Sequence, residues 1–362
     1  MTIFSQEAWH QHDSVHFFRD SATGLRAIVA IHDTTLGPAL GGCRLWNYNT
    51  ETEAIRDVLR LSRGMTYKAA CAGLDLGGGK SVLMGPAPSD PDKREAMFRH
   101  FGNCIESLGG QYITAEDVGT SVGDMAAVAS KTNHVTGGPK AMGGSGDPSP
   151  YTAHGVFLGL KAAVKHQLGK DSVEGLRILV QGVGHVGWWL AKELFEEGAE
   201  ILVSDINPES VQKAVEAWGA QVVSPQGNDW ACTAMDVYAP CALGGTLNEN
   251  TIPALQATVV AGAANNQLLV ETDAQALNDR GILYAPDYVI NAGGLINVDQ
   301  ERKGWDRDLV MEKLLAIGTS LTSIFRRSSR EEALTTLTAS RMIASDRLER
   351  VAQEKGKRKT SW

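Results

Sequence analysis

Two lysines and an aspartate are the residues best suited to acid–base chemistry in this chain. Lys68 lies in the stretch GMTYKAA, just after a predicted helix, and Lys80 follows the triple glycine of LGGGKS, which we expect to form a loop. A lysine with apolar neighbours that lies near a second cation can act as a base near neutrality. Asp117, at the end of a short predicted strand, can project into a cleft. The alternatives are solvated surface lysines and a helix or turn cap.

A glycine-rich run predicts a dinucleotide site. It follows an apolar strand, opens a helix and has Asp205 and Ile206 at the end of the next strand. Glycines at this spacing allow a tight turn, approach of a pyrophosphate and close helix–strand packing. A carboxylate at Asp205 would bind ribose hydroxyls and repel a 2′-phosphate, which favours NAD over NADP. The alternative for the glycines is an ordinary tight strand–helix turn, and the alternatives for Asp205 are a strand-end cap and a solvent carboxylate. The residues of the run are Gly182, Val183, Gly184, His185, Val186 and Gly187.

The elements that must position the lysines occupy the first 150 residues. Apolar and β-branched residues predict a strand over 25–31, and the glycines at 37, 41 and 42 predict a loop after it. Helical spacing begins at Thr52 and again over about 91–108 and 124–132, with a short strand at 112–114. The segment 137–150 is dense in Gly, Pro and Ser and is the best candidate for a loop or hinge between domains.

Beyond residue 150, strands and helices alternate. We expect helices over 153–166, 188–197 and 208–218, and strands over 177–181, 200–204, 237–239, 259–261 and 282–285. This rhythm is typical of a parallel sheet with helices on both faces. The fold class is therefore α/β, with two domains separated by a cleft. Residues 1–150 are expected to form an α/β substrate-binding, catalytic and oligomerisation domain that carries the lysines, and residues 151–330 a doubly wound, Rossmann-type NAD-binding domain. The helical tail 331–362 is expected to complete the first domain.

Composition excludes several classes of protein. The 362 residues carry a formal net charge of −8, which gives no basic field for nucleic acid or an anionic membrane. The start has no signal-peptide pattern, and no apolar run is long enough for a membrane span. Five scattered cysteines without CxxC spacing favour reduced thiols over disulfides or zinc, and we expect a cytoplasmic protein without a metal site.

Long stretches of the chain closely resemble the glutamate/leucine/phenylalanine/valine dehydrogenase family, the leucine dehydrogenases most of all. The resemblance covers nearly the whole chain in one order. The matching stretches are LGPALGGCRLW (36–46), RLSRGMTYKAACAGLDLGGGK (60–80), GGQYITAEDVGTS (109–121), GDPSPYTAHGV (146–156), QGVGHVG (181–187), APCALGG (239–245), VAGAANNQL (260–268) and GILYAPDYVINAGGLINV (281–298).

The resemblance implies an enzyme that oxidatively deaminates an L-amino acid with NAD, giving a 2-oxo acid and ammonia, reversibly. Lys80 would be the general base that activates water, Asp117 the proton shuttle, and Lys68 the partner of the substrate carboxylate. Asn266 and Asn291 would orient the substrate amine and the nicotinamide carboxamide. The remaining cofactor contacts implied by the family are Arg44, Ser149, Thr152, Ala239, Pro240, Cys241, Ala263 and Asn265.

The same resemblance suggests an apolar substrate pocket. Glutamate dehydrogenases carry a lysine just before the paired glycines of the first motif, where this chain has Leu40. An unpaired second carboxylate would be costly to bury there, so leucine, valine or isoleucine is expected. One methylene discriminates by only about 1–3 kcal/mol, which leaves a phenylalanine- or tryptophan-preferring enzyme as the alternative. Plain core packing is the other interpretation of the pocket wall, which comprises Leu40, Ala115, Leu295 and Val298. The further substrate contacts are Gly41 and Met65.

Two further questions stay open at this stage. The tail from about Arg326 matches the family only loosely, and relatives use this region in subunit contacts, so a homo-oligomer is expected without a fixed size, a dimer or an octamer. A catalytically silent NAD-binding protein is the alternative from another functional class. The presence of Lys68, Lys80 and Asp117 together argues against it.

Overall fold

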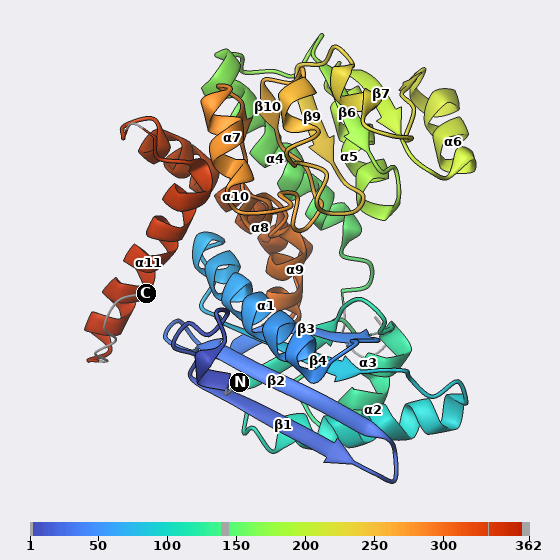
Figure 1. Cartoon of the computed structure of the whole chain (residues 1–362), viewed down its shortest axis with the longest axis vertical. Coiled ribbons are helices and arrows are strands. Elements are labelled where there is room, and N and C mark those ends of the chain that lie inside the picture. Colours follow the sequence, from blue (N-terminus) through green and yellow to red (C-terminus); the bar gives the residue numbers. More distant parts are fainter. Residues whose placement is uncertain (1–2, 139–144, 332, 357–362) are drawn as a thin grey trace. The chain divides into compact units, whose positions relative to one another are not determined.

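The computed structural model describes residues 3–138, 145–331 and 333–356, and the chain forms two compact units (Figure 1). The first unit comprises residues 1–146, 298–306 and 344–362. The second comprises 147–297 and 307–343. The C-terminal end of the chain thus belongs to the first unit, while the change of unit near residue 147 falls in the Gly- and Pro-rich segment. Of that segment, residues 139–144 lie outside the described residues.

The first unit is built on a five-stranded mixed sheet with the order β1-β2-β4-β3-β5. Strand β1 (Ser14–Asp20) is antiparallel to β2 (Leu25–Asp33), which is antiparallel to β4 (Gly77–Met84). Strand β3 (Ala39–Trp46) runs parallel to both β4 and β5 (Tyr112–Glu116). A short 3₁₀ helix, η1 (Ile3–Ser5), precedes the sheet.

Helices cover both faces of this sheet (Figure 1). Helix α1 (Glu51–Cys71) packs on the face that carries Ile28 and Ala30. Helices α2 (Pro91–Glu106) and α3 (Val122–Ala129) pack on the face that carries Val29 and Ile31. Since successive strand residues point to opposite faces, β2 is buried along almost its whole length and separates two cores.

Three local expectations for this unit are wrong. Gly41 and Gly42 belong to strand β3, and the three glycines before Lys80 belong to strand β4, where loops were expected. The reason is close strand approach: a Cβ atom at Gly41 would lie 1.7 Å from the carbonyl oxygen of Gly79. Lys68 lies inside α1, one turn before its end, and not after the helix. Strand β1 was not foreseen.

The second unit contains a six-stranded, all-parallel sheet with the order β11-β10-β9-β6-β7-β8. The expected α/β class is confirmed. The strands are β6 (Arg177–Gln181), β7 (Glu200–Ser204), β8 (Gln221–Val222), β9 (Val237–Pro240), β10 (Val259–Val260) and β11 (Leu283–Tyr284). Leu179 and Tyr238 face a core with Trp230, while the alternating Ile178 and Val180 are also buried, so both faces are covered.

The remaining helices begin in the second unit, and two of them, α9 and α11, continue into residues of the first unit. They are α4 (Ser149–Leu168), α5 (His185–Glu196), α6 (Pro208–Trp218), α7 (Asp273–Asp279), α8 (Asp287–Ile290), α9 (Gly293–Glu301), α10 (Arg307–Ser328) and α11 (Thr336–Glu354), with 3₁₀ turns η3 (Asp229–Cys232) and η4 (Ile252–Ala254). Helix α4 begins at Ser149, inside the segment expected to be non-helical, because a proline is compatible with a first helical turn. Helices α8 and α9 were not foreseen.

Within the described ranges, no helix is both long and apolar enough to cross a membrane. All five cysteines are free thiols, of which Cys43, Cys71 and Cys104 are buried. Among the described side chains, no three His, Cys, Asp or Glu residues gather as metal ligands would.

Candidate active site

Strand alternation gathers the candidate catalytic residues on one face of the first sheet. In the parallel pairing of β3 with β4, Arg44 lies opposite Val82, and Val82 belongs to the core under α1. Residues two apart on a strand share a face, which puts Lys80 and Gly42 on the α1 side with them. Gly42 also pairs with Ala115 of β5, two residues before Asp117. Three neighbouring strands therefore present their polar residues to the same side.

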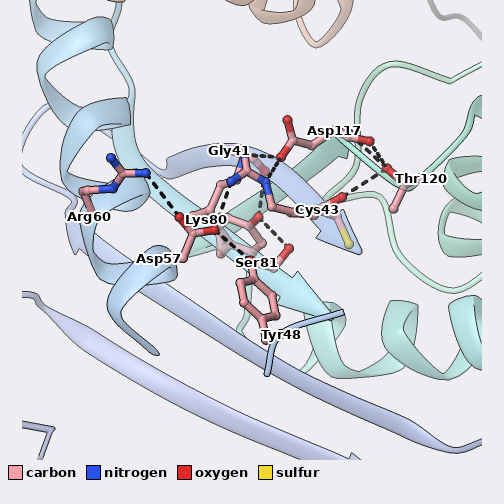
Figure 2. A network of polar contacts seen from close by, with 11 residues as sticks. Gly41, Cys43, Tyr48, Asp57, Arg60, Lys80, Ser81, Asp117 and Thr120 are labelled. Atoms are coloured by element: carbon pink, nitrogen blue, oxygen red, sulfur yellow. Dashed lines mark hydrogen bonds and ion pairs between the residues drawn. The ribbon is translucent and has the colours of Figure 1, made fainter. Parts of the chain in front are cut away.

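Lys80 and Asp117 form a close ion pair (Figure 2). The Lys80 ammonium Nζ lies 2.7 Å from Asp117 Oδ2, and the lysine side chain is only 7% exposed. Gly42 makes this approach possible, since a Cβ atom there would lie 2.7 Å from the Asp117 Cβ and 3.2 Å from Lys80 Nζ. The sequence expectation that these two residues act together is consistent with their direct contact.

Asp117 is held from both its backbone and its side chain. Its amide donates to Thr120 Oγ1 at 2.9 Å, and the Thr120 hydroxyl lies within hydrogen-bonding distance of the carbonyls of Cys43 (3.0 Å) and Asp117 (2.8 Å). Burial alone would raise the pKa of the Asp117 carboxyl, but Lys80 and then Arg44 outweigh it, and the pKa lies below its ordinary value. Asp117 is therefore an anion in this arrangement.

Arg44 connects Asp117 to a second carboxylate, that of Asp57. Its Nε donates to Asp117 Oδ2 at 3.1 Å and its Nη1 donates to Asp57 Oδ2 at 2.9 Å. The Tyr48 hydroxyl donates to the same Asp57 oxygen at 2.7 Å, and Arg60 lies 3.5 Å from the other. Tyr48, Asp57, Arg60 and Thr120 were missed in the sequence, because nothing local links residues that a strand and a helix bring together.

Helix α1 brings the two other first-unit candidates to this face of the sheet. Met65 and Lys68 are three residues apart, on one side of the helix, and both are half-buried. The helix backbone can approach β4 closely only at a glycine: a Cβ atom at Gly78 would lie 2.1 Å from the amide nitrogen of Thr66. Gly78 thus sets the spacing between α1 and the strand that carries Lys80.

Leu40 and Gly41 lie on β3 in a tightly packed region. Leu40 is only 2% exposed, and Ala115, the neighbouring pocket candidate on β5, is half-buried. The carbonyl of Gly41 accepts a 2.6 Å hydrogen bond from the buried Tyr112 hydroxyl, which also lies 3.1 Å from the Ser81 hydroxyl. Leu40 is thus a buried apolar side chain, and the residue after it, Gly41, is hydrogen-bonded through its carbonyl to Tyr112.

The glycine-rich run of the second unit has the geometry of a tight strand–helix turn. Gly182 has φ +92°, a conformation that favours glycine, and its amide donates to the Ser204 carbonyl. A Cβ atom at Gly187 would lie 1.8 Å from the Gly182 carbonyl oxygen, whereas one at Gly184 would meet open space. Helix α5 begins at His185 without a side-chain cap, so its N-terminal end can bind a phosphate.

Asp205 lies at the end of β7, beside this turn. Its Oδ2 accepts a 2.7 Å hydrogen bond from the Val183 amide and its Oδ1 accepts one from the Asn207 amide at 2.8 Å. Both alternatives from the sequence thus apply in part, since the carboxylate caps backbone and is still half-exposed, with further acceptor capacity. Ile206, next to it, is 89% exposed.

The asparagines of the second unit form a small network. Asn291 Nδ2 donates to the Ala263 carbonyl at 3.0 Å and to Asn265 Oδ1 at 2.7 Å. Within the described part of the chain, the buried Asn291 Oδ1 has no hydrogen-bond partner. Asn266 is exposed and has φ +52°. An unpartnered buried oxygen next to an exposed, unusually folded loop is an expected feature of a ligand site.

The other candidates occupy positions around the sheet and helices of this unit. Ala239 and Pro240 are buried in β9, and the amide of Cys241 donates to the Gln181 carbonyl, just before the glycine run. Ser149 and Thr152 lie in the first turn of α4. Leu295 and Val298 lie three residues apart on α9 and thus share one face of that helix, although Val298 is counted with the first unit.

Two family profiles match the chain. The profile described as the dimerisation domain of Glu/Leu/Phe/Val dehydrogenases matches residues 9–134, and the profile of glutamate/leucine/phenylalanine/valine dehydrogenases matches 143–208 and 205–356. A leucine dehydrogenase of Geobacillus stearothermophilus is 51% identical over 96% of this chain and 94% of its own length. A leucine dehydrogenase of Bacillus subtilis is 50% identical over 98% and 96%.

Similarity extends to an enzyme with another substrate in its name. The L-tryptophan dehydrogenase of Nostoc punctiforme is 42% identical over 99% of both chains. Its crystal structure superimposes with a TM-score of 0.84 and covers 95% of this chain and 97% of that one. The fold expected from the sequence is thus confirmed over nearly the full length.

Proposed function

The chain belongs to the glutamate/leucine/phenylalanine/valine dehydrogenase family, and from that premise we propose that it oxidatively deaminates a branched-chain L-amino acid. The family and the near-full-length similarity make it a leucine dehydrogenase-like amino-acid dehydrogenase. The proposed products are the 2-oxo acid, ammonia and reduced NAD. The observation that carries the proposal is the 2.7 Å contact of Lys80 with Asp117, a base and a proton carrier on one sheet face.

The second unit has a backbone that fits a dinucleotide. The left-handed Gly182, the open space at Gly184 and the uncapped start of α5 leave room and N–H groups for a pyrophosphate. NAD, when bound, would accept a hydride from the substrate Cα. Asp205 would accept hydrogen bonds from ribose hydroxyls, which favours NAD over NADP. Asn291, whose Oδ1 is unpartnered within the described residues, supports a contact with the substrate amine or an amide group.

Each side chain of the first unit has a defined task in the proposed reaction. Lys68 pairs with the substrate α-carboxylate. After hydride loss the substrate is an iminium ion, and neutral Lys80 takes a proton from water as the water oxygen bonds to Cα, giving a carbinolamine. Asp117 takes up and delivers protons at the nitrogen, so that the C–N bond breaks with release of ammonia and formation of the 2-oxo acid.

Leu40 supports an apolar substrate. The side chain is 2% exposed and offers no charge to a second carboxylate, and an unpaired carboxylate buried beside it would be strongly disfavoured. Glutamate is therefore a poor substrate under this proposal, and leucine, valine and isoleucine are good ones.

A homo-oligomer, a dimer or an octamer, is also proposed, in line with the dimerisation-domain profile, and light scattering would measure its mass.

A substrate panel tests the proposal. Reduction of NAD is followed by absorbance at alkaline pH with L-leucine, L-valine, L-isoleucine, L-phenylalanine, L-tryptophan and L-glutamate, for the wild type and for Lys80→Ala. The highest kcat/KM is expected for a branched-chain substrate, with no turnover by the variant. A preference for phenylalanine or tryptophan would overturn the substrate assignment. Absence of turnover with every amino acid, despite NAD binding, would favour a silent NAD-binding protein.

A further inference from the structure

Arg44 was expected to contact the cofactor, but its guanidinium is already committed to two carboxylates. It spans from Asp117 to Asp57, with donor–acceptor distances of 3.1 and 2.9 Å, and its side chain is 21% exposed. Tyr48 donates to Asp57 and fixes the far end of this bridge. A planar guanidinium held at two points has little freedom to turn toward another ligand.

Lys80 and Arg44 contact the same oxygen of Asp117. Oδ2 lies 2.7 Å from Lys80 Nζ and 3.1 Å from Arg44 Nε. Lys80, Arg44, Asp117 and Asp57 together carry two positive and two negative charges, a balanced set. When Lys80 gives up its proton, the set becomes negative by one charge, and Arg44 remains as the permanent partner of Asp117.

We infer that Arg44 is a positioning residue, which orients the Asp117 carboxylate toward Lys80 and stays its counter-cation while Lys80 is neutral. The inference rests on the proposed roles of Lys80 and Asp117. A neutral base beside an unpaired buried carboxylate would be unfavourable, because the ammonium form would be strongly preferred. Because Arg44 stays charged, Asp117 remains ionised and paired when Lys80 is neutral. The four side chains Lys80, Arg44, Asp117 and Asp57 then carry a net negative charge, which favours a cationic substrate nitrogen.

Within the described part of the chain, Arg44 is the permanently charged group in contact with Asp117, so this task falls to Arg44. Besides Lys80 and Arg44, the titratable groups coupled to Asp117 include Cys43, Tyr48 and Tyr112, from neighbouring strands and the loop after β3, and these three are neutral. Burial raises the pKa of the Cys43 thiol to about 12, which keeps it uncharged. Glu116, the adjacent carboxylate, and Asp57, bound to Arg44, add negative charge only, and the 52% exposed Arg60 contacts Asp57.

Kinetics of Arg44→Gln and Arg44→Lys test the inference. With Arg44→Gln the whole charge of Asp117 acts on Lys80, so the rising limb of the kcat/KM pH profile should move up by roughly one pH unit, and kcat should fall about 100-fold. Arg44→Lys keeps the charge but loses the two-point bridge, so the limb should stay near its wild-type position while kcat falls about tenfold. The KM for NAD should change less than about threefold in both.

Arg26→Gln is the matched control. Arg26 lies on β2 of the same sheet and pairs with Glu51 of α1 at an exposed position, so this variant removes the same charge and should leave the pH profile unchanged. An unshifted limb in Arg44→Gln, with a large rise in the KM for NAD, would overturn the inference in favour of a cofactor contact. If Arg44→Gln does not fold, Arg44→Lys still tests the inference. A rising limb of the kcat/KM pH profile that lies a full pH unit above that of the wild type in Arg44→Lys would contradict the role of Arg44. Wild-type turnover separates the two proposals. An active wild type whose pH profile is not shifted by Arg44→Gln would contradict only the role of Arg44. An inactive wild type would contradict both the role of Arg44 and the proposed function.

Discussion

The two candidate regions of this chain use different parts of the polypeptide. At Lys80, charged side chains from two strands, from the residue after a third strand and from a helix meet, and each is held by another charge. At the glycine run 182–187, backbone amides and open space form the site, and the main charged side chain, Asp205, is bound to backbone amides. Under the proposed function, the first region places the reactive groups and the second forms the binding surface for the cofactor. Substitutions should therefore affect turnover in the first and cofactor affinity or stability in the second.

The largest effect is expected for Lys80→Ala. Removal of the proposed base should lower kcat by about 10⁴-fold, at the upper end of general-base effects, while NAD binding, measured by calorimetry, stays within about twofold of wild type. This outcome would separate the chemistry of the first region from the binding of the second. A variant that keeps most of its turnover would show that another group activates water.

Gly187→Ala addresses the second region without touching an ionised group. The added Cβ would lie 1.8 Å from the Gly182 carbonyl oxygen, so the turn must shift, at a cost of roughly 1–3 kcal/mol in the free energy of unfolding. NAD affinity should fall with it. Gly184→Ala, where a Cβ meets open space, is the stability control and should unfold at the wild-type denaturant concentration. Equal stability of the two variants would contradict the close packing of helix and turn.

Asp205→Asn sharpens the same comparison, because it removes the charge but keeps an acceptor for the Val183 amide. The preference for NAD over NADP should relax by about tenfold, which corresponds to about 1.4 kcal/mol. The ratio of kcat/KM values for the two cofactors measures this. An unchanged ratio, with the turn intact, would mean that Asp205 only caps backbone.

The smallest predicted effect concerns Asp117 and stability. Its folded pKa is lowered, against burial, by Lys80 and Arg44, so its contribution is present above the unfolded pKa and is lost as pH falls through the folded pKa. Asp117→Asn should be less stable than wild type at neutral pH by about 1 kcal/mol, the scale of a partly exposed ion pair. Denaturant unfolding should show the gap closing below about pH 4, near the ordinary Asp pKa. A constant gap from pH 3 to 7 would contradict the coupling.

The contrast between the regions also explains what could be predicted from the sequence. The glycine run is local, and its strand, turn, helix and Asp205 follow in order, so strands 177–181 and 200–204 and helix 208–218 were placed to the residue. The lysines and Asp117 stood out by their motifs. Their pairing could not be derived locally, because β3 was taken for a glycine loop, and without β3 the alternation that aligns Arg44 with Lys80 is invisible.

Other residues of the site could not be predicted either, because their contacts join parts of the chain that are distant in the sequence. Asp57 and Tyr48 have no motif and matter only because Arg44 reaches them across the strand–helix connection. The glycines at 77–79 suggested an exposed loop, but they exist where strands and helix backbone approach too closely for a side chain. These glycines thus correctly indicated a close approach of backbone, but they lie in a strand and not in a loop. The domain boundaries and the roles of the cofactor-binding candidates stay predictions.

A crystal structure with NAD and an unreactive branched-chain substrate analogue would test the central claim most directly. The account predicts Lys80 Nζ about 3 Å from a water that faces the analogue Cα, with Asp117 near its nitrogen and Arg44 still bound to Asp117. A Lys80 ammonium that points to bulk solvent, far from both ligands, would contradict it.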